Sequence, residues 1–265
     1  NLRTQRVMTI DANTGYDSKN RMLGYEEITN EYCVDANGAK DSSRLDIYTK
    51  TVRRDMAYDD NITNLGRLTH YVDTITADPA NPAKSPNPGL ITVRTVDIDP
   101  RTNVQESTGI LKGYDSFNRM VGYDAKTEEY DASKNIFSLT TTTGRRNMAY
   151  DDATNKLGKL TGYTDTINSS STTALTTTRA MSGITYDVKG LMSGYTDITR
   201  EHSAAAGQLD VYTKTTRSGM LYDDTGTNTT NLGRLRYYVD TITADPAHSN
   251  LSPDPNLVIE KAVTI

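Results

Sequence analysis

The sequence predicts an all-β fold: a single continuous array of tandem β-hairpins over residues 1–265 that forms an elongated, twisted or solenoid-like antiparallel sheet. The first observation is a Tyr-Asp pair that opens a polar turn and recurs six times. The second is the composition, because 17 Tyr, two Phe, no Trp and 35% hydrophobic residues suit a thin sheet with one face partly exposed to solvent. The six hairpins begin at Tyr16, Tyr58, Tyr114, Tyr150, Tyr186 and Tyr222.

The hairpins alternate between a short and a long kind, and the short kind has a recognisable turn. Asp opens a type I turn, and the fourth residue after Tyr takes the left-handed position that closes the turn with a bulge. This geometry places each Tyr opposite the Met that follows six residues later. The closing residues are Asn20, Asn118 and Gly190.

An Asp–Arg pair accompanies two of the short turns. Asp17 is predicted to face Arg21, and Asp115 to face Arg119. In the third copy Leu191 replaces the arginine. The pair is therefore expected to be an accessory of the turn and not a requirement for it.

The long hairpins carry a doubled Asp and a larger connection that ends in Gly, a basic residue and Leu. Their return strands continue as Tyr-x-Asp-Thr-Ile, and β-branched linking strands follow at residues 45–53, 137–143 and 209–217. No amphipathic helix is predicted, because the best candidate, residues 203–208, is too short. The doubled residues are Asp59-Asp60, Asp151-Asp152 and Asp223-Asp224.

Three connections are longer and are predicted to be surface loops. Residues 77–88 and 244–255 are rich in Pro and Asn, and a further insertion lies near residues 100–108. Residues 73–80 and 240–247 are identical, which indicates that whole blocks of the chain have been copied.

The two ends of the chain resemble one interior strand. Residues 3–10 resemble residues 91–98, and residues 258–265 resemble both. Neither end has the polar capping unit that keeps a solenoid soluble. A terminal strand offers unpaired N–H and C=O groups, so we expect more chain or the next subunit to cover it.

The doubled aspartates are the sharpest candidates for a binding site, because oxygen ligands in a tight loop suit Ca²⁺. The alternative is that Asp and Asn simply form Asx turns without an ion. No EF-hand spacing is present. The calcium candidates are Asp59, Asp60, Asp151, Asp152, Asp223 and Asp224.

Other polar and aromatic groups give weaker signals. Gly-Tyr pairs could form an aromatic strip for carbohydrate, or each Gly could leave room for a neighbouring ring. His70 is expected at the surface, and Cys33, the single cysteine, is expected to be structural or an intermolecular link. The Gly-Tyr pairs are Gly24-Tyr25, Gly122-Tyr123, Gly162-Tyr163 and Gly194-Tyr195.

Charge and hydropathy argue against two classes of partner. The net charge of -5 and the lack of a basic cluster argue against nucleic acid, which needs a basic face. No apolar run approaches the roughly 18 residues that would suggest a membrane span.

The core pattern Tyr-Asp-x-x-Gly-Arg-Leu-x-x-Tyr resembles the YD-repeat family of Rhs-type bacterial proteins and teneurins. It also resembles the repeat tracts of giant bacterial surface proteins. The resemblance implies a long spiralling β-sheet that can close into a shell, and a surface location. It is carried by Tyr16-Asp17 with Arg21, Tyr58-Asp59 with Gly66-Arg67-Leu68, Tyr114-Asp115 with Arg119, Tyr150-Asp151 with Gly158-Lys159-Leu160, Tyr186-Asp187 with Gly190, and Tyr222-Asp223 with Gly233-Arg234-Leu235.

Every candidate polar group belongs to a repeat and none is unique, which favours a structural protein over an enzyme. The leading hypothesis is an extracellular or cell-surface β-repeat protein that forms filaments head to tail with copies of itself through open terminal strands. A second hypothesis is an adhesin that binds carbohydrate or protein through its Tyr-rich face or Pro-rich loops. A third is a segment of an Rhs-like shell. No catalytic residue and no other cofactor is predicted.

Overall fold

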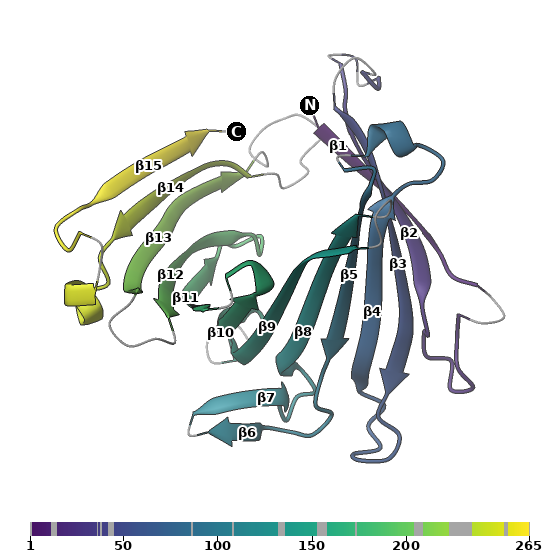
Figure 1. Cartoon of the computed structure of the whole chain (residues 1–265), viewed down its shortest axis with the longest axis horizontal. Coiled ribbons are helices and arrows are strands. Elements are labelled where there is room, and N and C mark those ends of the chain that lie inside the picture. Colours follow the sequence, from purple (N-terminus) through teal and green to yellow (C-terminus); the bar gives the residue numbers. More distant parts are fainter. Residues whose placement is uncertain are drawn as a thin grey trace. The chain divides into compact units, whose positions relative to one another are not determined.

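The fold is almost entirely antiparallel β-structure, as predicted (Figure 1). In the computed structural model, η1 (Pro82–Lys84), η2 (Ser170–Thr172) and η3 (Pro246–Leu251) are short 3₁₀ turns in the connections. The structure describes residues 2–11, 15–35, 37, 39–41, 45–85, 87–107, 109–131, 136–152, 158–172, 174–203, 209–222, 235–251 and 254–264.

The strands follow one another along the chain, joined by connections of different lengths. They are β1 (Leu2–Thr9), β2 (Tyr25–Cys33), β3 (Asp46–Tyr58), β4 (Leu68–Ala77), β5 (Leu90–Asp97), β6 (Val104–Ser107), β7 (Ile110–Tyr114), β8 (Met120–Asp131), β9 (Ile136–Tyr150), β10 (Leu160–Ser169), β11 (Leu175–Tyr186), β12 (Met192–Ser203), β13 (Asp210–Tyr222), β14 (Leu235–Thr243) and β15 (Ile259–Thr264).

Each strand pairs with its neighbours in the sequence. The order is β1-β2-β3-β4-β5-β8-β9-β10-β11-β12-β13-β14-β15, and β6 and β7 form a hairpin beside this path. The insertion predicted as a loop near residues 100–108 is therefore partly a strand, since β6 pairs with β7 from Val104 to Lys112.

The predicted turns of the short hairpins are confirmed. The turns of the short and long hairpins are called short and long corners below. The three Tyr–Met pairs are formed, Tyr16 with Met22, Tyr114 with Met120 and Tyr186 with Met192. The closing residues adopt left-handed backbone, because a residue with positive φ is needed to turn the chain into its bulge. Their φ angles are 60° at Asn20, 62° at Asn118 and 86° at Gly190.

Strands of four types recur in a fixed order, so the repeating block is two hairpins. The first type shows this through its register: a cation faces the Thr that lies four residues after a Gly-Tyr pair. Arg6 faces Thr29, Arg94 faces Thr127 and Arg179 faces Thr199. The first type comprises β1, β5, β11 and β15, and the second comprises β2, β8 and β12. The third comprises β3, β9 and β13, and the fourth comprises β4, β10 and β14.

Each third-type strand bends at a left-handed residue. In β3 and β13 the register shifts there, at Asp55 (φ 55°) and Gly219 (φ 60°). The Gly of the preceding Gly-Tyr pair faces this bend: a Cβ on Gly24 would lie 2.5 Å from the Arg53 carbonyl oxygen, and one on Gly194 2.9 Å from that of Arg217. The prediction that these glycines make room for a ring was wrong, because the close neighbour is backbone.

The chain divides into two compact units, residues 1–102, 116–118 and 123–142, and the remainder. The first holds β1 to β5, and its buried apolar side chains include Val96, Ile98 and Ala125. The second holds β6, β7 and β10 to β15, and buries Met181 and Ile184. Both cores are small, so hydrogen bonds and ion pairs across the strands take a large part in fixing the array.

Candidate functional site

The first Asp of a doubled pair organises its own loop. Asp59 is 5% exposed and accepts hydrogen bonds from the backbone N–H groups of Asn61, Ile62 and Thr63 at 3.1, 2.7 and 2.7 Å, and one from the Thr63 hydroxyl. The Thr63 hydroxyl, together with the three N–H donors, lowers the pKa of Asp59 to about 2. This is the Asx-turn arrangement that the sequence offered as the alternative to calcium.

The second Asp joins its corner to the preceding one. Arg21 of the first short corner donates to both carboxylate oxygens of Asp60 at 2.8 Å, while its Nε donates to Asp17 at 2.7 Å. Arg119 does the same with Asp152 at 2.5 and 2.8 Å. These hydrogen bonds hold the pKa values of Asp60 and Asp152 below their usual range. The arginine is therefore more than an accessory of its own turn.

The basic residue of the long corner extends this chain of contacts to the next short corner. Arg67, 6% exposed, donates through Nη2 to the side chain of Asn118 at 2.6 Å and through Nη1 to the Pro100 carbonyl at 2.6 Å. In the next block the ammonium of Lys159 lies 4.9 Å from the Tyr186 ring centre. These contacts between successive corners were not predicted from the sequence, although the Gly-Arg-Leu and Asp-Asp patterns recur together.

The described calcium candidates are engaged by groups of the protein itself. The carboxylates of Asp59, Asp60 and Asp152 all accept hydrogen bonds from protein groups, and the described residues contain no group of three or more His, Cys, Asp or Glu arranged to hold a metal. The third candidate pair, Asp223 and Asp224, lies outside the described residues. Asp151 lies at its corner, where its N–H donates to the Lys159 carbonyl.

Four of the six tyrosines that open a hairpin bond to the preceding corner. Each hydroxyl donates to a backbone carbonyl on the return strand of that corner, and burial raises the pKa of each phenol. A cation lies over two of these rings, Arg21 at 4.6 Å from the centre of Tyr58 and Arg119 at 4.4 Å from that of Tyr150. The bonds are Tyr58 to Met22 (2.7 Å), Tyr150 to Met120 (2.6 Å), Tyr186 to Leu160 (2.8 Å) and Tyr222 to Met192 (2.6 Å).

A second row of contacts crosses the middle of the strands and explains the Tyr-x-Asp-Thr-Ile pattern. In each case an arginine of the third strand type forms two hydrogen bonds of 2.7 or 2.8 Å with the Asp and stacks 3.7–3.9 Å from the Tyr ring centre. The sets are Arg53 with Asp73 and Tyr71, Arg145 with Asp165 and Tyr163, and Arg217 with Asp240 and Tyr238. Cations of the same chain also lie over the tyrosine rings of the Gly-Tyr pairs, at 5.4 Å for Tyr25, 5.8 Å for Tyr123 and 5.5 Å for Tyr195.

The hydrogen bond from Arg200 lowers the pKa of Asp210, and His202 and His248, which both lie near this carboxylate, act in the same direction. The described residues contain no group of three or more His, Cys, Asp or Glu that could hold a metal. His70 is hydrogen-bonded to Asp97 at 2.7 Å, and His248 to Asp245 at 2.6 Å while it stacks on Tyr212. Cys33 is half-buried and free.

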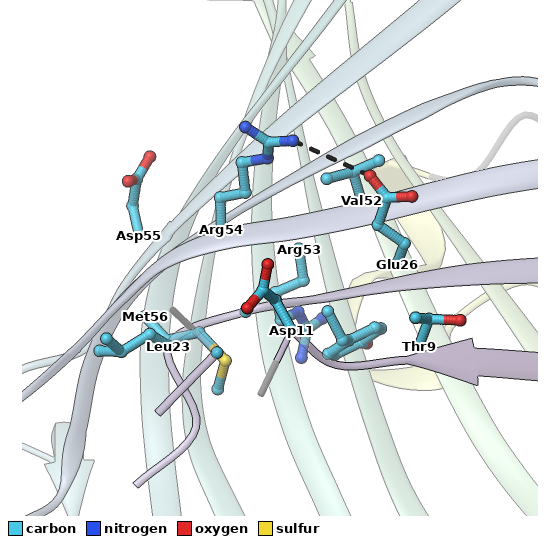
Figure 2. A pocket seen from close by; sticks show the side chains of 12 residues that line it. Thr9, Asp11, Leu23, Glu26, Val52, Arg53, Arg54, Asp55 and Met56 are labelled. Atoms are coloured by element: carbon cyan, nitrogen blue, oxygen red, sulfur yellow. Dashed lines mark ion pairs between the residues drawn. The ribbon is translucent and has the colours of Figure 1, made fainter. Parts of the chain in front are cut away.

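A cavity of about 650 Å³ lies in the first unit, between the end of β1, the first corner and the bend of β3 (Figure 2). Arg54 and Glu26 form an ion pair of 3.9 Å at its wall. Among the described residues its lining holds no His, Cys or Ser. The lining residues are Thr9, Asp11, Gly15, Leu23, Gly24, Tyr25, Glu26, Val52, Arg53, Arg54, Asp55 and Met56.

The edges of β1 and β15 are the features that distinguish the two ends of the strand order. Within the described chain β1 pairs only with β2, and β15 only with β14. Both strands expose apolar side chains, with Val7 and Met8 of β1 53% and 51% exposed and Ile259 of β15 44% exposed. A strand with an unpaired edge is a template for pairing with another strand.

Comparison with known proteins found no matching protein-family model, no matching curated protein and no matching solved structure. Among the described residues no helix has the length and apolar character needed to cross a membrane.

Proposed function

We propose that this chain is a structural β-repeat protein that assembles head to tail with copies of itself, through strand pairing at β1 and β15. The observation that carries the proposal is the unpaired edge of each of these strands, with Val7 and Met8 of β1 and Ile259 of β15 exposed beside it. Their interior equivalent, β5, is paired on both sides, with β4 and with β8. Each terminal strand has one of these two partners, so a second copy can supply the other.

The use of the polar groups supports a structural role over an enzymatic one. The arginines, aspartates and tyrosines that recur in the repeats are hydrogen-bonded to one another or to backbone, and they connect corners or neighbouring strands. Such groups maintain the spacing of an array. Catalysis would need a nucleophile, acid or base that faces a substrate site.

The resemblance to YD-repeat and bacterial surface proteins supports an extracellular or cell-surface location. In that setting a heterologous contact that does not close on itself extends into a filament. Main-chain hydrogen bonds between paired strands would fix the register of the contact, and the side chains of β1 and β15 its specificity.

The experiment compares two Val→Lys variants. Val7→Lys places a charge on the proposed interface, and edge lysines oppose strand pairing. Val188→Lys places the same charge on a fully exposed corner. Electron microscopy and sedimentation velocity across a concentration series should show filaments for the wild type and for Val188→Lys, and a large loss of filaments for Val7→Lys. Monomeric wild-type protein at every concentration would contradict the proposal.

A further inference from the structure

We infer that assembly occurs by strand exchange: β1 of one copy takes the place of β15 on β14 of the next. This inference rests on the proposed self-assembly and specifies its geometry. It starts from the equivalence of β1 and β15, which are both copies of the same interior strand type. Two copies joined end to end therefore carry one such strand too many at the junction.

The interior strand β5 shows what a complete junction contains. Arg94 of β5 faces Asp73 of β4 on one side and Thr127 of β8 on the other. At the two ends of the strand order, the equivalents of these two pairings are divided between β1 and β15. Arg6 of β1 faces Thr29 of β2, while Lys261 of β15 faces Asp240 of β14.

Strand direction opposes a simple side-by-side contact between β15 and β1. Because both strands correspond to β5, they run in the same direction relative to the repeat. Placed next to each other they would form a parallel pair, whereas all the assigned pairs in the described chain are antiparallel. Removal of one strand restores the antiparallel order of the interior.

The pairing lengths indicate that β15 is the strand that leaves. It forms six residue pairs with β14, whereas β1 forms eight with β2. Arg6 also approaches Glu27 of β2 to 4.0 Å, a contact that β1 keeps when it joins β14. In the new position Arg6 would face Asp240 of the next copy, as Arg94 faces Asp73 in the interior.

The expected register follows from β4 and β5. Val72 faces Thr95 there, so Val239 of one copy should face Val7 of the next, at the place that Ala262 occupies in the separate chain. The interior pair Ile75–Thr92 predicts Ile242 opposite Thr4 in the same way.

The test locks β15 to β14 in the whole 265-residue chain. Val239 and Ala262 are directly paired, so Val239→Cys with Ala262→Cys, in a Cys33→Ser background, allows an intramolecular disulfide. Assembly is measured by sedimentation velocity and electron microscopy in the oxidised state and after reduction. The oxidised protein should lose more than tenfold of its assembled fraction, and reduction should restore it.

A second variant reads the register directly. Val7→Cys with Val239→Cys, again with Cys33→Ser, should give a reducible ladder of oligomers, because these residues meet only when β15 has left β14. The matched control, Val7→Cys with Thr241→Cys, moves one cysteine two residues along the strand and should give no ladder.

The outcomes separate the inference from the proposed function. Assembly that is undiminished in the locked protein, or the absence of the Val7–Val239 ladder from assembled material, overturns strand exchange and leaves self-assembly standing. Failure of the reduced protein and of the wild type to assemble at any concentration overturns both.

Discussion

At the scale of single residues, the repeated side chains act between corners as well as within them. The Tyr150 hydroxyl reaches the Met120 carbonyl at 2.6 Å, and Arg119 beside it binds Asp115 and Asp152. The residues involved lie about thirty positions apart, yet they meet because each hairpin stacks on the one before it. The Tyr-Asp repeat thus sets the spacing between successive hairpins.

Removal of the Tyr150 hydroxyl should destabilise the fold. Tyr150→Phe leaves the Met120 carbonyl without this donor, and we expect a loss of about 1 kcal/mol in the free energy of unfolding. Urea denaturation measures it. Tyr237→Phe is the control, since no hydrogen bond of its hydroxyl is found among the described residues. Equal losses in the two variants would argue against the tyrosine contacts.

Acid should weaken the long corner through Asp59. Its pKa is lowered to about 2 in the folded protein, below the usual value near 3.9 for Asp. The stabilisation is therefore complete above pH 4 and is lost as the pH falls through 2. Urea midpoints between pH 5 and pH 2 should fall less steeply for Asp59→Asn than for the wild type, and identical slopes would contradict this role.

At the scale of the element, the bend in each third-type strand depends on a glycine in the strand before it. Gly122 of β8 illustrates the fit, because a Cβ there would lie 2.6 Å from the Arg145 carbonyl oxygen, near the left-handed Asn147 of β9. Gly162 of β10 fits the first-type strand β11 in the same way, with its Cβ 2.8 Å from the Met181 carbonyl oxygen and the left-handed Gly183 close by. Backbone cannot move aside as easily as a flexible side chain. A side chain introduced at such a glycine is therefore expected to alter the bend of the strand that faces it.

Gly162→Ala should cost more than 1 kcal/mol of stability, because the added Cβ displaces the Met181 carbonyl or opens the strand pair. Gly89→Ala is the matched control, with its nearest heavy atom at 3.8 Å. Thermal and urea unfolding of both variants measure the difference. A Gly162→Ala protein as stable as the control would show that the bend tolerates a side chain.

The local rules predicted the corners well, and the contacts between corners poorly. Asp17, Asn20 and Met22 specify a turn within seven residues, so their backbone geometry and register could be read from the chain. The clamp from Arg21 to Asp60 joins residues that no short window contains. The close approach of Gly24 to backbone was missed for the same reason.

At the scale of the whole molecule, a repeating block of two hairpins places the same strand type at both ends of the described order. An interior copy of that strand, β5, has partners on both sides, and each terminal copy has one. Self-association is the use of these edges that we propose, and the resemblance to YD-repeat proteins stays a prediction beside it. The distribution of partners between β1 and β15 would give the proposed assembly its direction.

Hydrogen–deuterium exchange of the assembled and the dilute protein tests this arrangement most directly. If β1 pairs on both sides in the assembly and β15 is released, amides in residues 2–9 should become more protected while those in residues 259–264 become less protected. Unchanged exchange in both peptides, from dilute monomer to the highest concentration, would contradict it.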